Sequence, residues 1–172
     1  MHGERSYKLL QPRDLARLTD IALEDQTAFF RRNPDIAAVY ADRLVCIALC
    51  QGAGLHYVDH RNGIKDLDVW SFYRRSPKRS FPDRRPRVVR DFGDPRFGKS
   101  PDRLDFVGRR VDIFVKAVDA PESVTDSEAV RQYLANARTR TARLLAEKGV
   151  VALYPVRSRG TILWRGPYER AG

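Results

Sequence analysis

The sequence is poor in cysteine and in long apolar runs. Only two of its 172 residues are cysteines, too few for the disulfide framework of a small secreted domain. The longest apolar run, Leu44 to Cys50, has seven residues, whereas a helix that spans a bilayer needs about 20. The first residues also lack the apolar stretch of a signal peptide. We therefore expect a cytoplasmic protein that makes no contact with a membrane.

Positive charge and apolar side chains, in contrast, are both plentiful. Lys and Arg together number 32 against 22 Asp and Glu, which gives a net charge of +10. Such an excess favours anionic partners, for example nucleotides or nucleic acid. Hydrophobic residues make up 42% of the chain, enough for a buried core, so general disorder is excluded. The length fits a single domain over residues 1–172.

Most of the excess charge lies in one segment, Arg74 to Arg110. It holds 13 basic residues, 5 aspartates and 5 prolines. This composition predicts a long basic loop at about 74–110, with room for one short strand at Arg87–Phe92. Loops of this length are typically functional or disordered. Three interpretations stay open: a solvated loop, a surface that contacts RNA or another anionic acceptor, and a contact for a protein partner.

The hydrophobic pattern predicts alternating helices and strands. A helix is expected over Pro12–Arg32, and Asn33 and Pro34 begin a second, short one that ends near Arg43. A third helix starts at the capping-box sequence Thr125–Glu128 and ends at Gly149. Strands are expected at Leu44–Cys50, Leu67–Tyr73, Val111–Val118, Val150–Tyr154 and Thr161–Trp164. The continuous apolar run of the first is typical of a central strand. The fold class is therefore α/β (α+β), a mixed sheet flanked by helices.

Three aspartates stand at predicted strands. Asp66 and Asp68 flank a leucine, and side chains two residues apart in a strand lie on the same side. Neighbouring carboxylates repel each other, and a divalent cation with oxygen ligands removes this conflict. Asp112 interrupts an apolar strand, where a carboxylate needs a partner or a metal. The three carboxylates converge if the strands are neighbours; the alternative is a solvated strand edge with salt bridges to nearby arginines.

Glycines precede these aspartates. Gly52 and Gly54 predict a tight turn after the first strand. The order glycine, Ala53, twelve residues, Asp66-Leu67-Asp68, and a later strand with Asp112 resembles the polymerase-β-type nucleotidyltransferase superfamily. The resemblance covers roughly residues 37–118.

The resemblance implies a nucleotidyltransferase-like sheet and a reaction. The enzyme would transfer a nucleoside monophosphate from a nucleoside triphosphate such as ATP to an acceptor hydroxyl. Asp66, Asp68 and Asp112 would be the catalytic residues and would hold Mg²⁺ or Mn²⁺. Nucleotide-binding residues would be Gly52, Ala53 and Gly54, and Lys65 beside the first aspartate would neutralise phosphate charge.

One departure from the family pattern keeps a second function open. The family usually has a serine after the first glycine, and here Ala53 takes that place, so a hydroxyl contact to phosphate is lost. The alternative is a non-catalytic module of the same fold that binds nucleotide or nucleic acid through its basic loop.

Two other motifs have less support. Residues 93–100 match the P-loop formula, but Pro101 disfavours the helix that a P-loop requires at this point. His56 and His60 have a spacing that would allow metal binding on one helical turn, or they are structural.

Two cysteines and two aromatic residues also have expected roles. Cys46 and Cys50 lie about 13 Å apart along a strand, too far for a disulfide, so we expect buried free thiols. Trp70 and Phe72 share the strand side of Asp68, where they would stack on a base or belong to the core.

Overall fold

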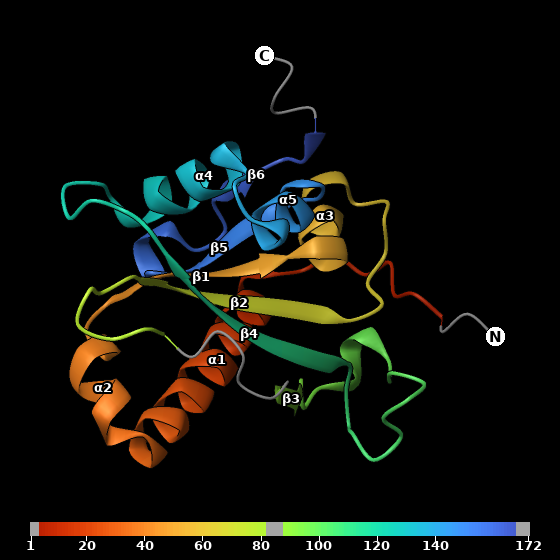
Figure 1. Cartoon of the computed structure of the whole chain (residues 1–172). Helices are drawn as coiled ribbons and strands as arrows, with labels where there is room; N and C mark the ends of the chain where they lie inside the picture. Colours follow the sequence, from red (N-terminus) through yellow and green to blue (C-terminus); the bar gives the residue numbers. More distant parts are fainter. Residues whose placement is uncertain (1–3, 82–87, 168–172) are drawn as a thin grey trace.

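A six-stranded mixed sheet forms the centre of the molecule (Figure 1). The structure is a computed structural model, and it describes residues 4–81 and 88–167. The strand order is β3-β4-β2-β1-β5-β6. The strands are β1 Leu44–Cys50, β2 Leu67–Arg74, β3 Val88–Asp91, β4 Arg110–Val118, β5 Val150–Tyr154 and β6 Ile162–Trp164. The pair β2 and β4 is parallel, and the other neighbouring pairs are antiparallel. The predicted α+β class is confirmed.

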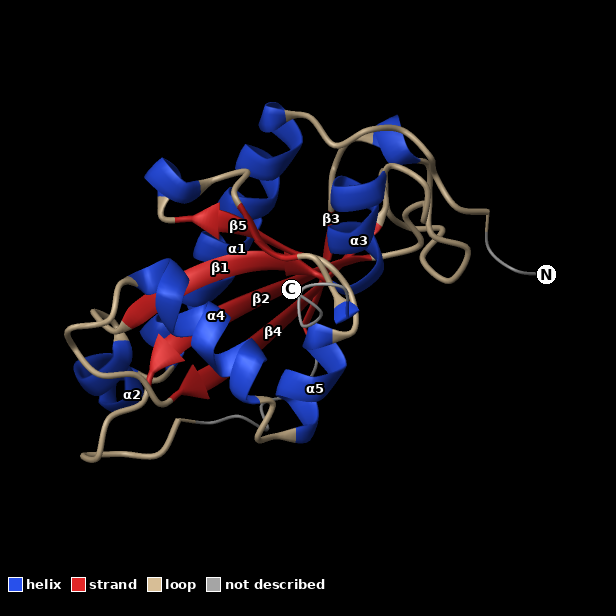
Figure 2. Cartoon of the chain, turned by 90° about the horizontal axis from the view of Figure 1, so that it is seen from above, coloured by secondary structure: helices blue, strands red, loops and turns tan. Residues whose placement is uncertain are grey.

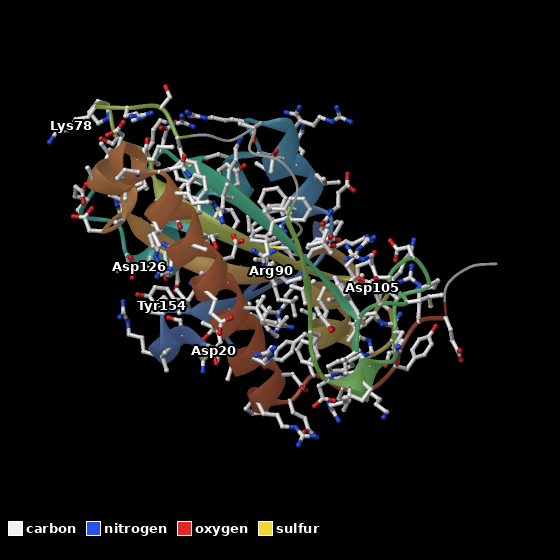
Figure 3. All side chains as sticks on the ribbon, turned by 90° about the horizontal axis from the view of Figure 1, so that it is seen from below. Asp20, Lys78, Arg90, Asp105, Asp126 and Tyr154 are labelled. Carbon is white, nitrogen blue, oxygen red and sulfur yellow. The ribbon has the colours of Figure 1, made fainter. Side chains whose placement is uncertain are left out.

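Helices cover both faces of this sheet. They are α1 Pro12–Arg32, α2 Pro34–Tyr40, α3 Gln51–Asp59, α4 Asp126–Asn136 and α5 Arg140–Ala146. Figure 2 shows α4 and α5 lying over one face, and Figure 3 shows α1 crossing the opposite face with Arg90 beside it. Helix α3 follows β1 directly at one end of the sheet (Figure 1). Among the described residues, no helix is long and apolar enough to cross a bilayer.

Strand β1 is central because both of its faces are apolar. Its residues after Leu44 are all buried. Ile47 and Leu49 belong to the core cluster under α1, whereas Cys46 and Ala48 belong to the cluster under α4 and α5. The predicted central strand is confirmed, and its neighbours β2 and β5 hold it in place on both sides.

The helix expected from Thr125 to Gly149 is in fact two helices. Helix α4 ends where Ala137 adopts a left-handed conformation with φ of 48°. Helix α5 then begins at Arg140. Its N-cap residue is Thr139, whose side-chain oxygen accepts a hydrogen bond from the N–H of Ala142. The prediction of one helix was wrong because the apolar spacing continues through a break that is set by this local cap. Thr125 is the residue before α4, but its side chain makes no capping hydrogen bond.

The basic segment 74–110 is only partly a loop. Its middle contains β3, an edge strand paired with β4, which confirms the predicted short strand. A 3₁₀ turn follows at Pro95–Phe97. The predicted charges at Arg84, Arg85 and Arg87 lie outside the described residues.

Several of the described arginines of this segment hold the fold together. Arg90 pairs with Asp25 at 3.0 Å, and Arg96 pairs with Asp14 at 3.3 Å. Both of these aspartates are buried in α1. The guanidinium of Arg74 donates to backbone carbonyls that follow β4. Part of the positive charge is therefore engaged in structural contacts.

The two cysteines are buried free thiols, as expected. Loss of solvent around Cys46 raises the pKa of its thiol to about 12. Burial also raises the pKa of Cys50 well above its usual value.

Candidate functional site

Two of the three predicted carboxylates lie side by side in the sheet. In the register of the strands, Cys50 at the end of β1 is paired with Asp68 of β2, and Asp68 is paired with Asp112 of β4. Neighbouring strands lie about 4.8 Å apart. Side chains at paired positions of parallel strands lie on the same face, so Asp68 and Asp112 are neighbours on the face that α4 and α5 cover in part. We call Asp66, Asp68 and Asp112 the carboxylate site.

Asp66 joins this site through an arginine. The Nη2 atom of Arg110 lies 3.2 Å from Oδ2 of Asp66 and 3.2 Å from Oδ2 of Asp112. Because one nitrogen reaches both oxygens, the two carboxylates are held at the same end of the sheet. Strands β2 and β4 are therefore neighbours, as the predicted convergence of the three carboxylates requires, and the alternative of salt bridges to a nearby arginine is present.

Burial differs strongly between these two carboxylates. The Asp112 side chain is 1% exposed and that of Asp66 is 19% exposed. An ionised carboxylate as buried as Asp112 needs a counter-charge, which Arg110 provides. Burial raises the pKa of Asp66, and the nearby Arg110 opposes this rise. Apart from Arg110, the ionisable side chains of this site are carboxylates, and such a site favours a cation.

The donor chemistry fits a hard divalent ion. Carboxylate oxygens are ligands that Mg²⁺ and Mn²⁺ accept readily, and the site already holds one cationic group between Asp66 and Asp112. Residues 4–81 and 88–167 contain no group of three His, Cys, Asp or Glu side chains arranged to hold a metal ion. That Asp66, Asp68 and Asp112 hold such an ion stays a prediction.

The glycine segment lies at the same end of the sheet. The predicted tight turn at Gly52 and Gly54 was wrong, because these residues form the first turn of α3. The chain changes direction at Gln51, which has a φ of 55°, a left-handed value that is uncommon for a residue with a side chain. The first N–H groups of a helix lack partners within the helix and attract anions. Since Cys50 is paired with Asp68, this helix start lies next to the carboxylate site.

The three residues predicted to bind nucleotide here differ in exposure. Ala53 is fully buried within the core cluster under α1. Gly54 is buried against Gly149, and a Cβ on Gly54 would lie 2.9 Å from the Gly149 carbonyl carbon. Gly52 is half-buried, and a Cβ there would meet only the end of the Asn62 side chain, at 3.2 Å. Of the three, Gly52 offers its backbone most openly to a ligand.

Lys65 is exposed at this end of the sheet. Its backbone carbonyl accepts a hydrogen bond from Nη1 of Arg109. The side chain of Arg109 is buried and donates also to the carbonyls of Glu4 and Phe97. Loss of solvent lowers the pKa of Arg109. Arg109 thereby anchors the segment that leads into Asp66.

A basic hollow lies around Arg109. It has a volume of about 380 Å³, and Arg109, Arg5, Lys8, Arg96 and Lys99 are among its lining residues. Arg109 and Arg110 are consecutive at the start of β4, so their side chains point to opposite sides. Arg110 faces the carboxylates and Arg109 faces this hollow.

The aromatic residues beside the carboxylates belong to the core. The Trp70 ring stacks on that of Phe114, with 4.6 Å between centroids and 15° between planes. Trp70 is 8% exposed and Phe72 is fully buried. Of the two roles expected for Trp70 and Phe72, the structure shows the place in the core.

The two weaker motifs have structural explanations. Residues 93–100 contain a 3₁₀ turn and lead into strand β4 rather than a helix, so they form no P-loop, as Pro101 predicts. The buried side chain of Ser100 instead accepts a hydrogen bond from the N–H of Arg110. The Nδ1 atom of His56 accepts from the N–H of Gly63, and its Nε2 donates to the Lys8 carbonyl. With both ring nitrogens engaged, His56 cannot bind a metal together with His60.

Sequence reasoning missed two residues of the site, Arg110 and Gln51. Arg110 had a usable signal, because it stands two residues before Asp112 and so shares its side of the strand. The left-handed backbone of Gln51 had none, since glutamine has no preference for it.

The fold and the site together define an α+β domain in which a carboxylate cluster adjoins a helix N-terminus. No protein-family model, curated protein or solved structure matches the chain.

Proposed function

We propose that the protein is a metal-dependent nucleotidyltransferase, which transfers a nucleoside monophosphate from a nucleoside triphosphate to an acceptor hydroxyl and releases pyrophosphate. The observation that carries this proposal is the row of paired residues Cys50, Asp68 and Asp112 across β1, β2 and β4. It sets carboxylate oxygens beside the first N–H groups of α3. A site for cations and a site for anions thus share one end of the sheet, and a nucleoside triphosphate with its metal supplies both charges.

Each part of the site has a role in this proposal. Asp66, Asp68 and Asp112 hold Mg²⁺ or Mn²⁺, which when bound stabilises charge on the attacking and leaving oxygens. Backbone N–H groups of the first turn of α3 donate to triphosphate oxygens, and Gly52 lets the phosphate approach closely because it has no side chain. Lys65 adds positive charge beside the phosphates.

The acceptor must reach the same end of the sheet. A carboxylate oxygen of Asp112 is the proposed proton acceptor for the attacking hydroxyl, and this requires that Arg110 leave that oxygen. The excess of positive charge in the segment Arg74 to Arg110 favours an acceptor that carries phosphate groups, such as RNA.

Metal-dependent nucleotide binding tests the proposal. We expect the protein to bind ATP, measured by calorimetry, in Mg²⁺ or Mn²⁺ and not in EDTA. Asp68→Asn should weaken this binding by more than the roughly 10- to 100-fold that follows loss of a residue which only supports a metal ligand. The matched control is Asp105→Asn, because Asp105 is a 67% exposed carboxylate that pairs with Arg103 at the same end of the molecule (Figure 3).

The outcome also decides between the two functions. ATP affinity that is indifferent to metal and to Asp68→Asn would contradict catalysis and favour a non-catalytic nucleotide- or nucleic-acid-binding module. Two observations favour that second function: Ala53 has no hydroxyl, and Arg110 pairs with two of the three carboxylates. The module should bind RNA with an affinity that falls steeply with salt. Charge reversal at Arg84 and Arg85 should weaken that binding.

A further inference from the structure

Arg110 is the residue that links the carboxylate site to the loop beside it. It begins β4 and lies on the same side of the strand as Asp112. Its Nη2 atom contacts Asp66 and Asp112, each at 3.2 Å, and its Nη1 atom is bonded to Asp102. Among the side chains with a described position, this guanidinium thus meets three carboxylates. These contacts point to a specific role for Arg110.

The position of Nη2 is the one that a bridging cation would take. Two carboxylates held close together resist joint ionisation, and a positive charge between them relieves that cost. Asp112 is 1% exposed, so a positive charge at its carboxylate also offsets the cost of its burial. A divalent ion on Asp66 and Asp112 would meet the same need through the same oxygens. The guanidinium and the ion cannot occupy this place together.

We propose that Arg110 is the resident counter-cation of the carboxylate site and competes with the divalent metal ion for Asp66 and Asp112. The proposal rests on the proposed function and adds its regulation: the metal binds when the guanidinium leaves. Asp112 has a cationic partner in both states, so the empty site stays compatible with a folded core.

The surroundings of Arg110 allow this exchange. Its backbone N–H is fixed by the buried hydroxyl of Ser100 at 2.9 Å, so the main chain keeps its place. Its Nε is buried and has no hydrogen-bond partner among the described residues, so the inner part of the guanidinium is not anchored. Asp102 is 55% exposed on the adjoining loop. When Nη2 leaves the site, Asp102 retains Nη1 and keeps the side chain at the edge of the site.

Metal binding by an arginine variant tests this competition. We expect Arg110→Gln to bind Mn²⁺, measured by the loss of the free-ion EPR signal, about tenfold more tightly than the wild type, or more, which is about 1.4 kcal/mol. The control is Lys99→Gln, which removes the same charge from the segment that leads into β4. The amine of Lys99 donates a hydrogen bond to the Leu104 carbonyl at 3.2 Å. Its Mn²⁺ affinity should stay within about twofold of the wild type.

A second measurement uses the unaltered protein, because Arg110→Gln leaves Asp112 without its ion pair and can unfold. The side-chain Nε–H resonance of Arg110, assigned by its absence in Arg110→Lys, should shift during a Mg²⁺ titration. Equal Mn²⁺ affinity of the wild type and Arg110→Gln, or Mg²⁺ binding with no shift of this resonance, would overturn the competition and leave the proposed function standing. Absence of metal binding in both proteins would overturn the two together.

Discussion

Alanine at Gly54 is expected to destabilise the protein, whereas alanine at Gly52 in the same helical turn is not. Helix α3 meets the turn before β5 through two glycines, Gly54 and Gly149. A Cβ on Gly54 would overlap the Gly149 carbonyl group and lie 2.8 Å from the Leu49 carbonyl oxygen. These are backbone atoms, so no rotamer change relieves the overlap. At Gly52 the close neighbour among the described residues is the end of the Asn62 side chain, at 3.2 Å.

The size of each effect follows from these contacts. Overpacking costs about 1–3 kcal/mol and at times more, and the rigid neighbours of Gly54 favour about 3 kcal/mol or more. Alanine in a helix gains about 0.5–1 kcal/mol over glycine, which at Gly52 offsets a small shift of Asn62. For a domain of this size, about 3 kcal/mol lowers the melting temperature by about 6–12 °C.

Thermal and urea denaturation, followed by circular dichroism, measure the difference. Gly54→Ala should melt about 6–12 °C below the wild type, and Gly52→Ala within about 3 °C of it. If Gly54→Ala melts with the wild type, or if both variants lose the same stability, the assignment of Gly54 to backbone packing is refuted. Gly52→Ala then serves the binding assay, where a folded protein with weakened ATP affinity would support phosphate contact at Gly52.

Two further predictions concern buried and hydrogen-bonded groups. Cys46 and Cys50 should be inert to Ellman's reagent at about pH 8 until urea unfolds the protein, because burial raises the pKa of both thiols; fast reaction of the folded protein would contradict this. Burial alone would raise the pKa of Asp91, but N–H groups of Gly93, Val107 and Gly108 lower it. This stabilisation is present above the ordinary value of about 4 and is lost as the pH falls through the lowered pKa. Asp91→Asn should therefore flatten the stability profile between about pH 5 and pH 2, and parallel profiles would argue against it.

The helices and strands could largely be predicted from local patterns. The apolar run at β1 is long and uninterrupted, and Pro12 marks the start of α1 by its backbone preference. The helix end predicted at Gly149 was wrong, because α5 ends at Ala146. The break between α4 and α5 was missed because it depends on one side-chain hydrogen bond at Thr139. The glycine turn was misjudged for a related reason. Gly54 is required by a contact with Gly149, which is distant in sequence.

The residues of the carboxylate site could be predicted from the sequence, but their arrangement in the sheet could not. The sequence by itself determined that Asp112 interrupts an apolar strand, and it predicted one shared strand side for Asp66 and Asp68, although β2 begins only at Leu67. Alternation of side chains is a local property, so no tertiary information was needed. Which strands are neighbours depends on the tertiary structure. Only the structure decided that β2 and β4 are parallel partners in a register that pairs Asp68 with Asp112.

The same division applies to the positive charge. The sequence determined its amount and its concentration between Arg74 and Arg110. Only the tertiary structure decided its use, because an arginine's partner depends on which carboxylate or carbonyl the fold brings within reach. Arg90 pairs with a helix that lies far away in sequence, and Arg109 anchors backbone carbonyls. Arg110, next to Arg109 in the chain, points to the other side of the strand and meets the carboxylates.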